Sequence, residues 1–90
     1  MKLVVSGYGI VSAIGLNKSE TLDSLLRERS GIGSMHFLKS IHTDLPVGEV
    51  RLSNKDICKR LDISSDYIIN RSSLLGIMAA REALTHASIK

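Results

Sequence analysis

The sequence predicts an α/β fold, and three segments carry that prediction. Apolar and β-branched residues open the chain as a strand over residues 2–11, and a helix with a capping signal follows over residues 18–29. A longer apolar helix is expected from about residue 66. The expected order is strand, capped helix, extended segment, short helix and long buried helix. Because one strand cannot pair its own backbone edges, the 90 residues are interpreted as an incomplete domain.

The opening strand begins with the apolar residues 3–5 and resumes at residues 10–11. Between these two stretches stand Gly7 and Gly9. Glycine inside a strand indicates a bulge or a close approach by another backbone. Residues 12–15 then turn the chain toward the first helix.

The first helix has a start signal, an apolar stripe and an end signal. Asn17 stands three residues before Glu20, which is a variant of the capping box. Three leucines at helical spacing give one apolar stripe: Leu22, Leu25 and Leu26. Arg27 and Arg29 complement the helix dipole in the last turn, and the following Ser-Gly pair ends the helix.

Residues 31–52 are expected to be irregular or extended, because they contain three residues that break regular structure: Gly33, Pro46 and Gly48. Ser53 or Asn54 then caps a short helix that runs through Arg60. In the long helix, residues 74–80 are apolar nearly all round, which predicts burial. Its C-terminal end is expected to surface, with polar side chains on one face: Arg81, Glu82, Thr85 and His86.

The single cysteine indicates a reducing compartment, and the net charge does not select a partner. The net charge of +3 is spread along the chain, so it permits an acidic partner but identifies none. Cys58 is the single cysteine and cannot form an internal disulfide. No apolar run approaches the roughly 20 residues that span a bilayer. We therefore expect a cytoplasmic protein without a membrane partner.

No catalytic, cofactor-binding or metal-binding residue is predicted. Cys58 lies among Ile57, Lys59 and Arg60 on the short helix, which favours a structural thiol over a nucleophile. The three histidines lack ligand spacing and are interpreted as ordinary side chains: His36, His42 and His86. The glycines of the opening strand approximate a dinucleotide fingerprint, but its third glycine is absent.

Four blocks of the sequence resemble the β-ketoacyl-acyl-carrier-protein synthases. Residues 4–15 (VVSGYGIVSAIG) are similar to the opening strand of that family, usually written VVVTGLGVVSPIG. Residues 29–32 (RSGI) resemble the turn after the family's first helix, and residues 46–50 (PVGEV) resemble a later strand. Residues 71–87, with AAREAL at their centre, resemble the long helix that carries an AAxEAL pattern. The blocks follow family order, so residues 1–90 are identified as the N-terminal portion of such a synthase.

The resemblance implies a thiolase-like fold, in which two related α/β halves pack together and two subunits form a dimer. It also implies acyl transfer and decarboxylative condensation in fatty acid or polyketide-type synthesis. In this chemistry a cysteine holds the acyl group as a thioester and two histidines assist decarboxylation. In the family these residues lie beyond the length of this chain. The chain is therefore expected to be a structural fragment of an acyltransferase, inactive alone and without cofactors.

The resemblance further implies an acidic partner, the acyl carrier protein. Many family members carry several lysines and arginines just before the long helix, where these help to dock the carrier. Here residues 63–69 contain no base. Lys59, Arg60 and Arg71 flank that stretch and are the candidate docking residues.

A small helix-turn-helix DNA-binding protein that uses residues 55–71 is the alternative. Four apolar residues stand near the inward positions of that motif: Ile57, Leu61, Ile63 and Ile68. A recognition helix starting at Ser64 would carry Arg71 as its sole base, which gives few phosphate contacts. This alternative also leaves the first 50 residues unexplained, so no nucleic-acid partner is expected.

The interpretation of the chain as an incomplete synthase segment also predicts self-association. Residues 2–11 would form a strand with unpaired edges, and the 74–80 stretch would lack neighbours. The isolated chain should therefore form a homo-oligomer or aggregate.

Overall fold

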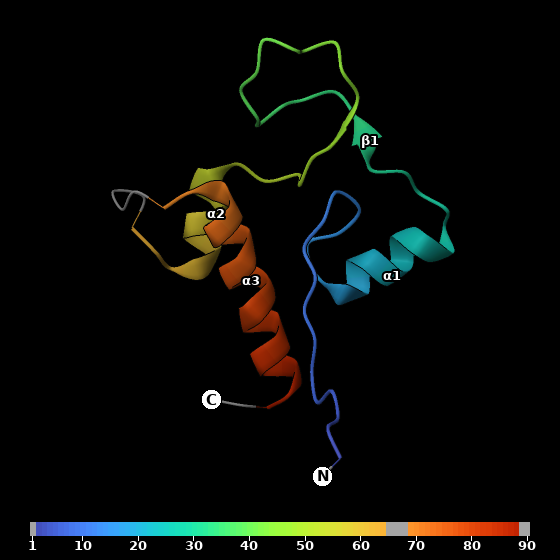
Figure 1. The fold of residues 1–90 in the computed structure, drawn as a ribbon, viewed down its shortest axis with the longest axis vertical. Coiled ribbons are helices and arrows are strands. Elements are labelled where there is room, and N and C mark those ends of the chain that lie inside the picture. The colour runs from blue at the N-terminus through green and yellow to red at the C-terminus, as the bar shows by residue number, and fades with distance from the viewer. Residues whose placement is uncertain (1, 65–68, 89–90) are drawn as a thin grey trace.

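The computed structural model describes residues 2–64 and 69–88 and has a mixed α/β content (Figure 1). Within these residues the elements follow the order α1 (Lys18–Leu26), β1 (Ile32–Gly33), β2 (Val47–Gly48), α2 (Asn54–Leu61) and α3 (Arg71–His86). The two short strands pair antiparallel, with Ile32 opposite Gly48 and Gly33 opposite Val47. No helix in the described part of the chain is long and apolar enough to cross a membrane.

A small core holds α2 against the first half of α3. Figure 1 shows the two helices side by side, with α3 extending beyond α2 toward the C-terminus. The buried hydrophobic residues come from these helices and from the residue that precedes α2: Leu52, Ile57, Cys58, Leu61 and Leu74. The side chains of Ile57 and Leu74 are almost fully buried, with exposed fractions of 0% and 1%. The chain therefore depends on a few apolar side chains for its tertiary stability.

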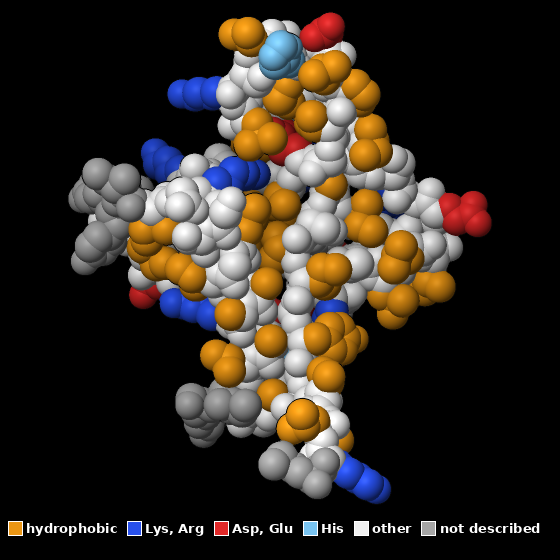
Figure 2. All heavy atoms as spheres, in the orientation of Figure 1, with side chains coloured by type: hydrophobic (Ala, Val, Ile, Leu, Met, Phe, Trp, Pro, Cys, Tyr) orange, Lys and Arg blue, Asp and Glu red, His pale blue; other side chains and the backbone are white. Residues whose placement is uncertain are grey.

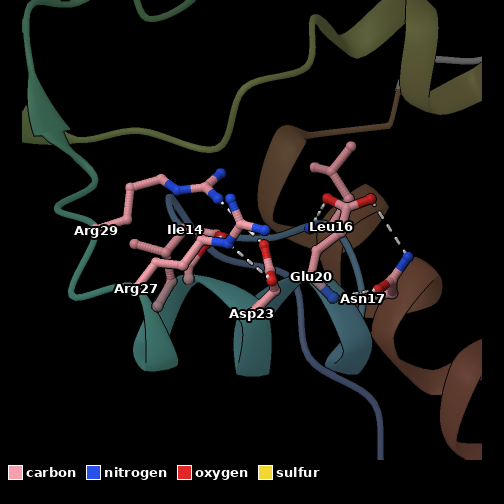
Figure 3. Close-up of polar contacts among 8 residues, drawn as sticks. Ile14, Leu16, Asn17, Glu20, Asp23, Arg27 and Arg29 are labelled. Atoms are coloured by element: carbon pink, nitrogen blue, oxygen red, sulfur yellow. Dashed lines mark hydrogen bonds and ion pairs between the residues drawn. The ribbon is translucent and has the colours of Figure 1, made fainter.

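The three helices of the described residues all begin at side-chain caps. The Asn17 carboxamide accepts the Glu20 amide hydrogen at 2.8 Å, and the Glu20 carboxylate accepts the Leu16 amide hydrogen at 3.0 Å (Figure 3). The Ser53 hydroxyl caps α2, which confirms the first of the two predicted caps. The Asn70 carboxamide caps α3 through the Ser73 amide. Each cap satisfies a backbone donor that the helix itself leaves unpaired.

α1 ends earlier than the sequence predicts. Its last helical residue is Leu26, and Glu28 has a left-handed φ of 54°, which stops the helix before residue 29. Arg27 and Arg29 both form ion pairs with Asp23 at 3.1 Å (Figure 3). All three side chains are more than half exposed, so these ion pairs contribute little to stability.

The leucine stripe of α1 faces solvent. Leu22, Leu25 and Leu26 are 58%, 62% and 76% exposed, and Figure 2 shows hydrophobic side chains on the surface over α1. The buried residues of this helix are instead Thr21 and Ser24. The Ser24 hydroxyl donates to the Ile14 carbonyl, so the small polar face of α1 packs against the turn at residues 12–16.

The predicted opening strand is wrong for this structure. The residues from 2 to 11 form no β-strand, and they run as an extended segment along α3 (Figure 1). Within the described residues the sheet has only β1 and β2, and neither pairs with this segment. A strand exists only where a partner strand accepts its backbone hydrogen bonds, and these residues find helix side chains instead.

The exposure of this segment leaves the self-association prediction in place. Leu3, Val4 and Val5 are 84–89% exposed. An unpaired apolar edge of this kind recruits other chains. Sedimentation at several concentrations is expected to show oligomers, and a monomer up to about 100 μM that unfolds cooperatively would contradict the prediction.

The long helix begins later, and is less buried, than predicted. Residues 66–68 of the expected helix lie outside the described residues, while Asn70 is extended and α3 starts at Arg71. Within 74–80, Leu74 is buried but Gly76 and Ala80 are exposed, so the prediction of all-round burial is wrong. The reason is geometric, because α2 covers one side of the helix and residues 7–10 another, and nothing within 4 Å faces Gly76.

Candidate functional site

Two of the three candidate docking residues lie on one exposed helix end. Lys59 and Arg60 occupy the last turn of α2, where both are exposed. Cations at this position are stabilised by the helix dipole. Asp62 then ends the helix in a left-handed conformation with a φ of 56°. These two side chains present positive charge to solvent at the C-terminal end of α2.

Arg71 does not join them, because it is held at the opposite end of α2. Its guanidinium donates to the Asn54 side chain and to the Val50 carbonyl, both at 2.9 Å. It also lies 5.9 Å from the centre of the Phe37 ring. Asn54 and Lys59 are five residues apart on one helix, which corresponds to roughly 7.5 Å along its axis. Arg71 therefore links α3 to α2 and to the segment before it, and the structure does not gather the three bases into one patch.

A buried carboxylate organises the loop between β1 and β2. Glu49 is 4% exposed, and its carboxylate accepts three consecutive amide hydrogens, from His36 at 2.8 Å, Phe37 at 2.9 Å and Leu38 at 2.7 Å. Burial alone would raise the pKa of Glu49, but the three amide donors and the nearby His36 outweigh it and lower the pKa. Sequence reasoning assigned Glu49 only to an extended segment, because no local pattern shows that residues 36–38 fold back onto it.

This arrangement predicts acid sensitivity of the loop. The pKa of Glu49 is lower in the folded chain than its ordinary value of 4.5, so its stabilising contribution is complete above that pH and is lost as the pH falls further. Glu49→Gln should reduce the loss of stability between about pH 5 and about pH 2, and should raise amide exchange at residues 36–38 about tenfold at neutral pH.

Urea unfolding at several pH values, together with amide exchange by NMR, measures both effects. Asp44→Asn is the matched control, since Asp44 is an exposed carboxylate in the same loop. Equal pH dependence in the Glu49 variant and the wild type would contradict the prediction.

A second carboxylate joins three elements. Glu82 of α3 accepts the amide hydrogens of Ile10 and Lys18, both at 2.9 Å. Burial alone would raise the pKa of Glu82, but the amide donors at Lys18 and Ile10, followed by the charges of Lys18 and His86, lower it. The sequence predicted Glu82 on a polar face that surfaces, whereas the structure turns it toward the start of α1 and the N-terminal segment. The local feature of the sequence that could have drawn attention to Glu82 is its i, i+4 spacing from His86, which places both side chains on one face of the helix.

The cysteine that the sequence analysis interpreted as a structural thiol lies in the hydrophobic core. Cys58 is a free thiol, 7% exposed, in the core beside Ile57 and Leu61. In the described ranges 2–64 and 69–88, no three His, Cys, Asp or Glu side chains are placed to hold a metal ion. Half of the predicted recognition helix (64–71), namely residues 65–68, lies outside the described residues.

Two surface pockets flank the turn at residues 12–16 and α1. One, of about 330 Å³, is lined mainly by that turn together with Glu20, Arg29 and Arg51. The other, of about 540 Å³, lies between residues 8–10 and the exposed side of α1, including Leu22. Cys58 and the histidines do not line either pocket.

Comparison with known proteins identifies the family. The chain is 32% identical over 90 residues to the 3-oxoacyl-[acyl-carrier-protein] synthase 1 of Buchnera aphidicola subsp. Schizaphis graminum, a match that covers 99% of this chain and 22% of that protein. The synthases of the same name from subsp. Acyrthosiphon pisum and subsp. Baizongia pistaciae are 34% and 30% identical over 89 residues, which is 98% of this chain and 21% of each.

No protein-family model matches the chain, and no solved structure matches it. The chain spans about a fifth of the length of the relatives that it matches. Because three such relatives align along almost the whole chain, it belongs, as a segment, to the 3-oxoacyl-[acyl-carrier-protein] synthases.

Proposed function

We propose that the chain is the N-terminal, architectural segment of a carrier-protein-dependent 3-oxoacyl synthase with a thiolase-like fold. The match of nearly all its residues to a fifth of three synthases is the observation that carries this proposal. Residues 1–90 form an incomplete part of the parent's N-terminal domain. The parent joins an acyl thioester to a malonyl donor with loss of carbon dioxide, in a fatty acid or polyketide-type pathway, and acts as a dimer.

The polar side chains of the segment support an architectural role. Glu49, Arg71 and Glu82 each use their charge to hold backbone groups of other segments. Charged groups engaged in this way are already solvated by the protein and are poorly placed to exchange protons with a substrate. Cys58 is buried among aliphatic residues. A nucleophilic thiolate instead needs an accessible and electropositive environment.

The acyl carrier protein is the proposed partner, and the relatives' names include it. Lys59 and Arg60 are the residues of this segment best placed to contact an acidic protein, because both are exposed on one helix turn. Arg71 is already committed to Asn54 and Val50, so its contribution is the position of α3.

A carrier-binding titration tests the docking surface. Alanine at both Lys59 and Arg60 should weaken binding of an acyl carrier protein about three- to tenfold at low salt, since exposed charge pairs contribute a few tenths to about 1 kcal/mol each. Lys39→Ala, which removes an exposed lysine from the β1–β2 loop, should leave binding unchanged. An equal loss of carrier binding in both variants would show a nonspecific charge effect and would contradict the proposed docking surface.

The activity assay tests the architectural role separately. The chain mixed with acyl- and malonyl-carrier protein should give no condensation, and Cys58→Ser should not alter that result. Turnover that disappears in the Cys58 variant would overturn the assignment.

Submicromolar binding of random duplex DNA with a steep salt dependence, lost on changing Lys59, Arg60 and Arg71, would favour the helix-turn-helix alternative.

A further inference from the structure

Two side chains of α3 hold one edge of the N-terminal segment. His86 accepts the Tyr8 amide hydrogen at its Nδ1 atom at 3.2 Å, and Glu82 accepts the Ile10 amide hydrogen at 2.9 Å. Tyr8 and Ile10 are two residues apart, so their amides point to the same edge of an extended chain. Glu82 and His86 are four residues apart, so they share one face of the helix. We call these two hydrogen bonds the α3 clasp.

The clasp depends on a close backbone approach. A side chain at Gly7 would place its Cβ 2.5 Å from the Ala83 carbonyl oxygen, and one at Gly9 would overlap the Ala79 carbonyl oxygen. The two glycines therefore let the segment lie directly on the α3 backbone. In this position Glu82 and His86 accept the amide hydrogens that the carbonyl oxygens of a neighbouring strand would otherwise accept.

The two bonds of the clasp respond differently to protons. A neutral imidazole accepts through Nδ1, whereas an imidazolium carries a hydrogen on both nitrogens and cannot accept. Histidine side chains ordinarily change charge between about pH 5 and 8. Glu82 remains an ionised acceptor over that range, because its pKa is lowered. Protonation therefore removes the bond to Tyr8 and leaves the bond to Ile10.

One aromatic ring and two charged side chains lie around His86. The Tyr8 ring lies edge-on to the imidazole, with the ring centres 4.8 Å apart. Glu82 stands four residues before His86 on the same helix, and the positive charge of His86 contributes to the lowered pKa of Glu82. From α1, the Lys18 ammonium lies 5.8 Å from the centre of the Tyr8 ring and brings a second positive charge to this site.

We propose that His86 is a protonation-sensitive latch, which holds the Tyr8 end of the N-terminal segment to α3 when neutral and releases it when charged. Release adds the Tyr8 amide to an N-terminal segment in which Leu3, Val4 and Val5 are exposed already. The latch thus controls how much of this segment is available for pairing with another strand. The inference rests on the clasp geometry and does not require the proposed enzyme function.

Amide exchange measured by NMR across about pH 5 to 8 tests the latch. After correction for intrinsic exchange, protection of the Tyr8 amide should fall about three- to tenfold on acidification, as expected for the loss of one hydrogen bond. Protection of the Ile10 amide should change less than about twofold and serves as the internal control.

Two variants sharpen this measurement. His86→Asn places a non-titrating acceptor near the Nδ1 position, so Tyr8 protection should persist and become independent of pH. Thr85→Asn, at the neighbouring exposed position, should retain the wild-type pH dependence. A constant ratio of Tyr8 to Ile10 protection in the wild type, or an unchanged pH dependence in His86→Asn, would overturn the latch.

Discussion

Replacement of Gly9 by alanine is expected to destabilise the chain by about 1–3 kcal/mol, because the new methyl group has no room against α3. The added Cβ would overlap the Ala79 carbonyl oxygen and would also lie 2.9 Å from the Ala83 amide nitrogen. Both are backbone atoms of a helix, so neither can yield without distortion of α3. The N-terminal segment must move away instead, which breaks the bond between Ile10 and Glu82.

Gly76→Ala is the matched control for this substitution. Gly76 lies inside α3, and an added Cβ would meet nothing within 4 Å. Alanine favours a helix interior by about 1 kcal/mol over glycine, so this variant should be more stable than the wild type. Urea unfolding followed by circular dichroism measures both changes. Equal stability of Gly9→Ala and the wild type would show that the segment does not lie on α3.

Replacement of Leu74 by alanine is expected to have the largest effect on stability, about 2–5 kcal/mol. Leu74 is 1% exposed and anchors the first half of α3 in the core formed with α2. The buried apolar core contains few residues, so its neighbours have little means to fill the cavity. Domains of this size have a total stability on the order of 5–10 kcal/mol, and this loss should remove about half of it.

Leu84→Ala tests whether the effect depends on burial. Leu84 lies on the same helix but is 48% exposed, so its truncation should cost less than about 1 kcal/mol. Thermal unfolding should remain close to the wild type for Leu84→Ala and become broad or disappear for Leu74→Ala. A similar loss in both variants would mean that the second half of α3 is as well packed as the first.

Local signals predicted the starts of α1 and α2 well. Asn17 and Ser53 cap α1 and α2 as the sequence indicates, because a cap is a bond between residues three apart and needs no tertiary information. The apolar stripe of α1 was also present as predicted, but periodicity cannot say whether a partner covers it. In the structure the face with Thr21 and Ser24 is buried, and Leu25 remains exposed.

Patterns that depend on distant partners were less predictable. The opening residues have strand-like composition, but a strand requires a second backbone, and the segment lies on α3 instead. The docking prediction grouped Lys59, Arg60 and Arg71 by their closeness in sequence. The structure separates Arg71 from the other two, because its guanidinium satisfies the Val50 carbonyl and the Asn54 side chain.

By itself, the sequence determined the mixed α/β content, the capped starts of α1 and α2 and the resemblance to the synthases, because short-range bonds and residue order encode them. Only the tertiary structure decided which faces are buried, where the N-terminal segment lies and which carboxylates hold the chain together. Glu49 and Glu82 each accept amide hydrogens from residues at least eleven positions away. A burial or hydrogen-bond partner at that distance is fixed by chain folding, and no pattern among neighbouring residues specifies it.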